Sequence, residues 1–498
     1  MVVERNQDLR AVNSRSGMRL KRWFREGELL WCVLNPSIPG PNDPEEAIMF
    51  WPGLVDEARV SAISSPDAIA DNSAPWSVEQ YTIYKVKLIA TSDMVSIPDH
   101  QVLPYQAYVP SPRLLETLAQ TPAADLDFDK ERLSNFHPFP GSSEHTPSFA
   151  EAVSSYALAL QIGSSLAQLW SLTDEWEFKY SLPPPPSGRQ QSTSLQAAIE
   201  MAGPSSQNLV VEPNVDMVGV VPSGTTSVHS QTRYQGLWWG AERIWTDDFL
   251  RLKIPRRCLA PGGAQNILAP SGPGPKTKET CANSGLDSAD FGAGTRGVFL
   301  RLDGLFTVDV QTSDGKIVKE CRANGMLYEL ADADWESSDS TAFSTTVQEK
   351  SNLPTIDPRS PNVQLSHPSR SAHYFLPEAP PGFKFRPILP EGYESVMSLT
   401  LISGRYYPNI LAHPLLTDVI SKATKPDLLQ SSDYLWALEG LAAGYTNSVD
   451  PERYAQNRLR MLDEADKTSR MLLEKHRDIA MEEPQDNSFN DTLMDFED

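Results

Sequence analysis

The chain of 498 residues is long enough for two ordinary domains and for much irregular chain, and its 41 prolines predict many loops. Its 43 basic and 65 acidic residues give a formal net charge of −22, which disfavours nonspecific binding to nucleic acid. Four widely spaced cysteines without a CxxC pair, no signal peptide and no run of eighteen apolar residues predict a soluble chain in cytosol or nucleus, with no zinc module, disulfide framework or membrane partner.

The N-terminal third predicts a small barrel followed by a helix. Residues 1–22 are polar and are expected to be loose. Apolar runs and period-two alternation then predict strands at residues 27–34, 47–55 and 79–91. A later segment changes to helical spacing, and Ser148 and Glu151 form a capping box at its start.

The middle and C-terminal parts predict a second β domain and two helices. A long segment rich in Pro, Ser, Gly and Gln predicts a disordered linker. Disordered insertions interrupt the second domain, and an acidic tail ends the chain. We therefore expect a mainly β fold with accessory helices (α+β), divided into a barrel with a helix at 20–180, a linker at 181–232, a β domain at 233–420 with insertions at 260–296 and 333–373, helices at 430–480 and a tail at 481–498.

The stretch GLWWGAERIWTDDFLRLK, residues 236–253, places Trp238, Trp239 and Trp245 within eight residues. On a single strand Trp239 and Trp245 share one side and Trp238 points to the other. Such aromatics fill a core or, less often, form a cage for a methylated ammonium through cation–π attraction of about 1 to 2 kcal/mol. A two-sided strand needs a second surface, from a partner chain or an inserted loop, so we expect an interaction scaffold.

No motif in the sequence predicts catalysis. The segment GAGTRG, residues 292–297, follows a polar loop and precedes a strand, so it is interpreted as a flexible loop, not a dinucleotide site. No GxSxG or HExxH motif is present. Paired carboxylates such as Asp247 and Asp248 are more simply solvated strand ends than an acid–base pair. We expect no enzyme, no cofactor and no metal site.

The segments GELLWC, FWPGLV, YKVKLIAT and VLPY, followed by a helix, resemble a PWWP domain, a reader barrel with an SH3-like fold. The resemblance implies that Trp51, which precedes Pro52, helps to form a methyl-lysine cage. Leu88 and Ile89 stand where the family has a second cage aromatic, and the neighbouring Phe50 and Tyr84 are its possible substitutes. The basic residues before the first strand and on the third form a face for DNA or, more simply, a solvated surface; they are Lys21, Arg22, Arg25, Lys85 and Lys87.

The second unit, with GAERIWTDDFLRL, GVFLRLDGLFTV and GMLYEL, resembles a bromo-adjacent homology (BAH) domain. Together with ISGRYYPNI, the layout of residues 20–420 resembles the fungal cryptic loci regulator family of transcription-silencing proteins. The resemblance implies a nuclear, non-enzymatic subunit of the heterochromatin complex SHREC. That family carries a further N-terminal region, so we expect it to be truncated or lost here.

Three hypotheses follow for function, and the third in rank is an enzyme with an unrecognised site. The first is a scaffold that links histone deacetylase and chromatin-remodeller subunits, in contact with nucleosome or DNA. The second is a reader of histone tails or DNA centred on Trp51. In GRYYP, residues 404–408, an internal clasp between arginine and tyrosine is favoured over ligand binding. The candidate binding residues are Trp31, Phe50, Trp51, Tyr84, Trp238, Trp239, Trp245, Arg405, Tyr406 and Tyr407.

Overall fold

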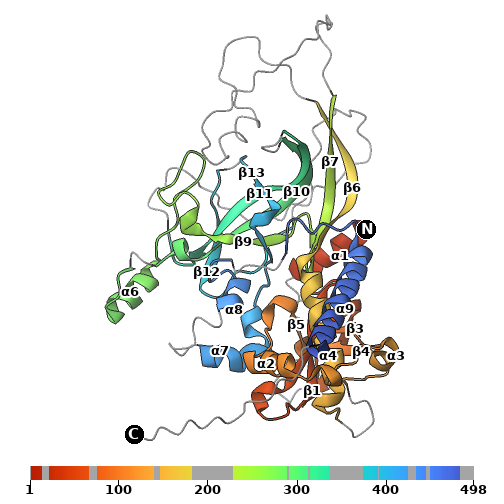
Figure 1. The fold of residues 1–498 in the computed structure, drawn as a ribbon. Helices are drawn as coiled ribbons and strands as arrows, with labels where there is room; N and C mark the ends of the chain where they lie inside the picture. Colours follow the sequence, from red (N-terminus) through yellow and green to blue (C-terminus); the bar gives the residue numbers. More distant parts are fainter. Residues whose placement is uncertain are drawn as a thin grey trace, which may run out of the picture.

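The computed structural model describes eleven segments of the chain and leaves the residues between them undescribed. These segments are residues 2–13, 22–66, 76–139, 146–181, 228–288, 291–311, 315–336, 374–390, 392–423, 433–444 and 449–482. The fold is mainly β with accessory helices, as the sequence predicts, and contains two antiparallel sheets (Figure 1). Most of the predicted linker, residues 337–373 of the second insertion and all but the start of the acidic tail lie outside the described residues.

The first sheet has the order β4-β3-β2-β1-β5. Its strands are β1 (Leu29–Ile38), β2 (Ile48–Pro66), β3 (Trp76–Leu88), β4 (Met94–Pro98) and β5 (Val102–Pro104). The three strands expected from the sequence are confirmed as β1, β2 and β3, although β2 and β3 run on as a long ribbon. The edge strands β4 and β5 do not pair with each other among the described residues, so closure of a small barrel stays a prediction.

The second sheet has the order β12-β11-β10-β7-β6, with β8 on β7, β13 on β11, and β9 between β10 and β14. Its strands are β6 (Trp170–Ser181), β7 (Val228–Trp239), β8 (Glu242–Trp245), β9 (Phe249–Pro255), β10 (Gly297–Gln311), β11 (Ile317–Asp332), β12 (Phe383–Pro387), β13 (Ser395–Ser398) and β14 (Ile402–Arg405). Strand β6 falls inside the predicted unit 20–180, but it pairs with β7 in this second sheet. The predicted domain boundaries stay a prediction.

Helix α4 (Phe149–Gln168) lies against the first sheet and along α9 (Arg458–Glu482) (Figure 1). Its predicted capping box is present: the Ser148 side chain accepts the Glu151 N–H, and the Glu151 carboxylate accepts the Ser148 N–H. The shorter helices are α1 (Val2–Asn13), α2 (Pro112–Gln120), α3 (Lys130–Ser134), α6 (Pro275–Ser284), α7 (Thr417–Ala423) and α8 (Asp433–Leu438). No helix in the described segments has the length and apolar character needed to cross a membrane.

Two segments expected to be loose are ordered. Within residues 1–22, α1 is fixed because Leu9 is buried and Asp8 accepts the Trp245 indole N–H at 2.9 Å. Within residues 260–296, the chain is fixed by the fully buried Arg256–Glu329 ion pair at 2.6 Å, since Arg256 also donates to carbonyls of this loop. Charged side chains hold both segments, so apolar patterning missed them.

The last helix begins later than predicted. Asp450 and Pro451 were expected at its start, but α9 begins at Arg458. Tyr454 forms a bridge with Trp170 at the start of β6, and the two rings lie 5.0 Å apart. This contact holds the chain in an extended form, so the helix starts only after it.

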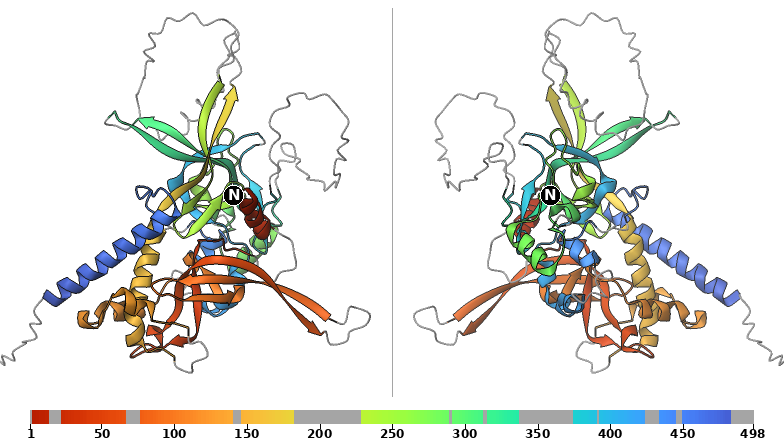
Figure 2. Two further views of the ribbon diagram at one scale, coloured as in Figure 1. Left: turned by 90° about the vertical axis from the view of Figure 1, so that its right-hand side faces the viewer. Right: turned by 90° about the vertical axis from the view of Figure 1, so that its left-hand side faces the viewer.

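The two sheets share their interior. The larger core contains side chains of the first sheet, α4, α8 and α9, together with Trp238 from the second sheet. A second core lies within the second sheet and contains Trp239, and a third, smaller core contains Phe249, Phe299, Tyr328, Leu330 and Tyr406. Figure 2 shows that the β2–β3 ribbon and helix α9 project away from this body on opposite sides. The paired strands β6–β7 and β10–β11 also extend outward from it.

Candidate functional site

The tryptophan-rich segment is a hairpin, not the single strand that we expected. Gly240 adopts φ of 61° between β7 and β8, and a Cβ there would lie 2.5 Å from the Ala167 carbonyl oxygen. The turn reverses the direction of the chain, so that Glu242 of β8 pairs with Trp239 of β7. Trp239 and Trp245 therefore belong to neighbouring strands, and parity along one strand does not relate them.

The second surface that Trp238 requires is supplied by the same chain. A Cβ at Gly27 would lie 2.8 Å from the Trp238 ring, so β1 and its preceding turn approach this ring closely. The guanidinium of Arg458 lies 4.3 Å from the ring centroid. Trp238 thus joins the second sheet to the first sheet and to α9, and these parts of the same chain leave it 5% exposed.

A buried polar cluster lies beside these tryptophans, where the two sheets meet. We name it the junction network and define it as Arg25, Glu28, Glu242, Asp248, Arg251, Arg405 and Tyr407. Glu28, which directly precedes β1 of the first sheet, accepts hydrogen bonds from Arg405 Nη2 at 2.8 Å and from the Arg243 backbone N–H at 2.7 Å. Each link crosses from one sheet to the other, so the cluster fixes their relative position.

Two other arginines of the junction network, Arg25 and Arg251, form further hydrogen bonds. Arg25 donates from both terminal nitrogens to the Asp248 carboxylate, at 2.6 and 2.7 Å. Arg251 donates to the Arg405 carbonyl at 2.7 Å and to Gln106 Oε1 at 2.6 Å. These bonds satisfy most of the buried charge, which otherwise costs several kcal/mol per ion.

The GRYYP motif forms the internal clasp that the sequence analysis favoured. Tyr407 donates to Glu242 Oε1 at 2.8 Å, and the Arg405 guanidinium lies 5.2 Å from the Tyr407 ring centroid. Gly404 is required because a Cβ there would lie 2.6 Å from Glu242 Oε2. The carboxylate of Glu28 raises the pKa of Arg405 above its ordinary value, although burial opposes the charge, so the guanidinium stays ionised.

All ten candidate binding residues are interior residues. The exposed fraction is 5% or less for every one of Trp31, Phe50, Trp51, Tyr84, Trp238, Trp239, Trp245, Arg405, Tyr406 and Tyr407. The side chains of Trp238, Arg405 and Tyr407 form contacts at the junction of the two sheets. The others pack elsewhere in the interior, and binding through any of the ten stays a prediction, since in this conformation none presents a surface.

Trp51, the centre of the implied cage, is completely buried. Its indole N–H donates to the Ile89 carbonyl at 3.0 Å, and its ring packs against Phe136 and Tyr156 at centroid distances of 5.6 and 5.1 Å. Phe50 similarly packs on Tyr108 at 4.3 Å. Trp51 therefore has no open face for a methylated lysine in this conformation.

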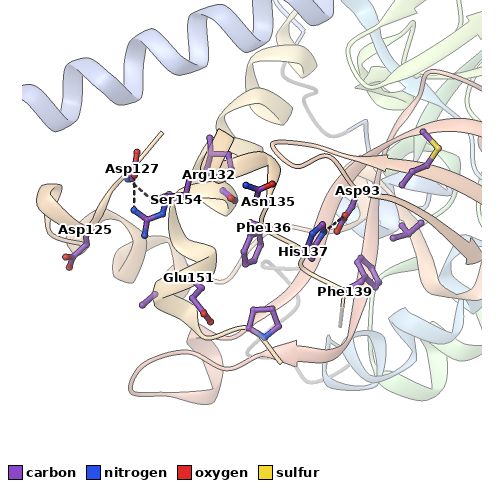
Figure 3. A pocket seen from close by; sticks show the side chains of 16 residues that line it. Asp93, Asp125, Asp127, Arg132, Asn135, Phe136, His137, Phe139, Glu151 and Ser154 are labelled. Carbon is purple, nitrogen blue, oxygen red and sulfur yellow. Dashed lines mark hydrogen bonds and ion pairs between the residues drawn. The ribbon is translucent and has the colours of Figure 1, made fainter. Parts of the chain in front are cut away.

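A pocket that sequence reasoning missed opens beyond Phe136, between β4, α3 and the start of α4 (Figure 3). Its volume is about 880 Å³, within the range of small-ligand sites. Three separate chain segments line it, so no local motif signals it. Its lining residues include Asp93, Asp125, Asp127, Arg132, Phe136, His137, Phe139 and Glu151. Among the described residues, no group of three or more His, Cys, Asp or Glu side chains is arranged to hold a metal ion.

Comparisons with known proteins give one structural similarity to report. No family model matches the chain, and no curated protein matches it. A solved structure of Clr2 bound to the Clr1 C-terminus is similar at 12% sequence identity and a TM-score of 0.31, covering 92% of this chain and 62% of that chain. The present chain thus spans less than two thirds of the length of the Clr2 structure's chain, and a TM-score this low does not establish a common fold.

Proposed function

We propose that the chain is a non-catalytic scaffold subunit of a nuclear heterochromatin-silencing complex. In this role it links a histone deacetylase and a chromatin remodeller, which carry the catalytic activities. The observation that supports a scaffold is the projection of paired strands and of α9 from one fixed body (Figure 2). The silencing context rests on the resemblance of the sequence motifs to the cryptic loci regulator family.

The clearest interaction surface is the outer β2–β3 ribbon, residues 57–66 of β2 and 76–82 of β3. Here β3 has passed the end of its pairing with β4, which stops at Ile83. Val60, Ile63 and Val78 on this ribbon are each 54% exposed, with Val60 and Val78 on one face and Ile63 on the other. A two-stranded ribbon is marginally stable in water by itself, so a partner that covers these apolar side chains stabilises it.

The exposed side of the distal part of α9 is a second surface. The helix contacts α4 and the turn Ala123–Asp125, but Met471, Ile479 and Met481 are 58%, 50% and 58% exposed. The ribbon and the helix project in opposite directions, and the junction network fixes the sheets between them. Two partners held on such a body meet at a raised effective concentration, which is the physical basis of a scaffold.

The reader hypothesis receives less support from the geometry. A cage needs aromatic faces that are open to solvent, whereas Trp51 is fully covered by Phe136 and Tyr156. A role in DNA binding lacks a comparable supporting observation, because Lys85 of the proposed basic face forms an ion pair with Asp56 at 2.7 Å.

Affinity purification of the tagged full chain from fungal nuclei tests the proposal. We expect a histone deacetylase and a remodelling ATPase to copurify, and we expect their recovery to fall when Val60, Ile63 and Val78 are all replaced by serine. Val109→Ser is the matched control, since Val109 is 58% exposed but lies outside the ribbon. Recovery of neither enzyme with the unaltered chain contradicts the silencing role. Equal recovery with the triple variant contradicts the ribbon assignment alone.

A further inference from the structure

Helix α1 covers Trp245, the last residue of β8. The Trp245 side chain is fully buried, yet it lies outside the three apolar cores found among the described residues. Its ring faces the guanidinium of Arg243, which lies 4.0 Å from the ring centroid, and its indole N–H donates to Asp8 of α1 at 2.9 Å. Polar groups therefore surround part of this tryptophan, and the indole N–H loses its acceptor if α1 moves away.

Two ion pairs join α1 to β8 and to the turn that follows this strand. Glu4 pairs with Arg243, and Arg5 pairs with Asp247. Arg5 Nε also donates to the Thr246 carbonyl at 3.1 Å. The surface beneath α1 thus presents a cation and an anion, and α1 meets them with opposite charges at two successive positions.

Further contacts of α1 bury little apolar area. Asp8 Oδ2 lies 3.9 Å from Arg25 Nε and also accepts the Trp245 N–H. Leu9 is buried, whereas Val3 is 68% exposed. A helix of 12 residues is marginally stable in water by itself, and salt weakens ion pairs that lie near the surface. We therefore expect α1 to open locally at a lower free energy than the sheets.

The side chains that hold α1 form one recognition pattern. Glu4 and Asp8 are four positions apart, so they lie one turn apart on the same face of the helix. Arg5 and Leu9 repeat this spacing on the adjacent face. A helix with Glu-Arg in one turn and Asp-Leu in the next therefore carries the charges and the apolar group that this surface fits.

We propose that the surface beneath α1 is a docking site for a helix of a partner protein, and that α1 covers it as an autoinhibitory segment. The partner helix carries the same pattern: a carboxylate for Arg243, a basic group for Asp247, and a carboxylate for the Trp245 indole, followed by an apolar residue in the place of Leu9. Tryptophan and arginine are the side chains that often dominate binding energy in protein interfaces. The site includes no residue of the outer β2–β3 ribbon or of α9. The inference therefore does not rest on the scaffold role, and either can fail without the other.

Fluorescence anisotropy with the full chain tests the proposal. The probe is a fluorescein-labelled peptide of residues 1–13, and the chain carries Asp8→Ala with Leu9→Ser to release its own α1. We expect this released variant to bind the probe at least about tenfold more tightly than the unaltered chain, because α1 in the same chain competes for the site. Arg10→Ala is the matched control: Arg10 is exposed on α1, so this variant should bind like the unaltered chain.

Trp245→Phe in the released variant identifies the site, since it removes the indole donor and should weaken binding about tenfold. Circular dichroism and urea unfolding verify that each variant folds. The proposal is overturned if the probe does not bind the released variant, or if the unaltered and released chains bind it equally. A Trp245→Phe substitution without effect overturns it as well.

A designed peptide tests the class of ligand. It keeps Glu4, Arg5, Asp8 and Leu9 of the probe and has alanine or glutamine at every other position, and its control also carries Glu4→Gln and Asp8→Asn. We expect the designed peptide to bind the released variant within about tenfold of the probe, and the control to bind at least about tenfold more weakly than the designed peptide. A designed peptide that binds no better than its control overturns the assigned class.

Hydrogen exchange of the unaltered chain tests whether α1 opens, and this measurement needs no variant. We expect the amides of residues 2–13 to exchange faster than those of α4 and β10, and faster still when NaCl is raised from about 0.05 M to about 0.5 M. Exchange in α1 that is as slow as in β10, or that salt does not change, overturns the autoinhibitory role.

Discussion

Replacement of Arg405 by methionine tests whether the junction network holds the two sheets together. The substitution keeps much of the side-chain volume but removes the donors to Glu28 at 2.8 Å and to the Trp23 carbonyl at 3.0 Å. The Glu28 side chain is 2% exposed, so the carboxylate is left in the interior without its hydrogen-bonded cation, and only Arg25 remains near it. Loss of one partner of such a pair costs about 3 to 5 kcal/mol of unfolding free energy.

A double-mutant cycle separates this penalty from the value of the pair itself. Glu28→Gln alone leaves the Arg405 cation unpaired, and the double variant removes both charges together. Because the side chains are in direct contact, we expect the double variant to be more stable than the sum of the two single losses predicts, by about 1 to 3 kcal/mol. Lys85→Met is the exposed control and should change stability little, since its ion pair with Asp56 is 43% and 46% exposed.

Urea unfolding followed by circular dichroism measures the free energies, and hydrogen exchange measures which strands open. We expect faster exchange in both β1 and β14, since Glu28 adjoins the first and Arg405 ends the second. A loss below about 1 kcal/mol for Arg405→Met, or strictly additive single losses, refutes the reasoning that the pair links the sheets. Faster exchange confined to β14 refutes it as well.

Two further predictions concern the same part of the chain. Gly404→Ala should destabilise the protein, by about 2 kcal/mol or more, because Gly404 has φ of 153° and its added methyl group meets Glu242 Oε2; urea midpoints measure this. Burial raises the pKa of Glu439 from 4.5 to about 7, so the stability that its protonated form provides is complete below pH 4.5 and is lost as pH rises to 7. Relative to the unaltered chain, Glu439→Gln should therefore gain about 3 kcal/mol between these pH values in urea unfolding, and a constant difference contradicts the assignment.

Local features of the fold were predictable where short-range chemistry determines them. The capping box at Ser148 and Glu151 places the start of α4 correctly, because both hydrogen bonds lie within four residues. The period-two pattern likewise located β3. By contrast, the Asp450–Pro451 signal failed, since a contact between Tyr454 and the distant Trp170 decides where α9 begins.

The candidate site was predictable only in part, because many of its contacts join residues that are distant in the sequence. The sequence indicated that the tryptophans face two surfaces, which is correct for Trp238 and Trp239, found in different cores. It did not indicate which surface covers Trp238, because that depends on Gly27, more than two hundred residues away. The pocket between β4, α3 and α4 had no local signal at all, since its lining comes from three segments.

The burial of the aromatic residues changes where binding surfaces are to be sought. Tryptophan is favoured in protein interfaces because it removes a large apolar area from water, but the same property favours it in the junction between two sheets of one chain. Here the junction uses Trp238 together with buried ion pairs, so these residues determine the relative position of the sheets, while Trp245 binds Asp8 of α1. In the proposed role, partner proteins then contact exposed aliphatic side chains such as Val60 and Ile63 on the projecting ribbon. An aromatic motif in a scaffold can thus mark the contact between two sheets of the same chain. The surface that binds a partner then has little distinctive sequence pattern.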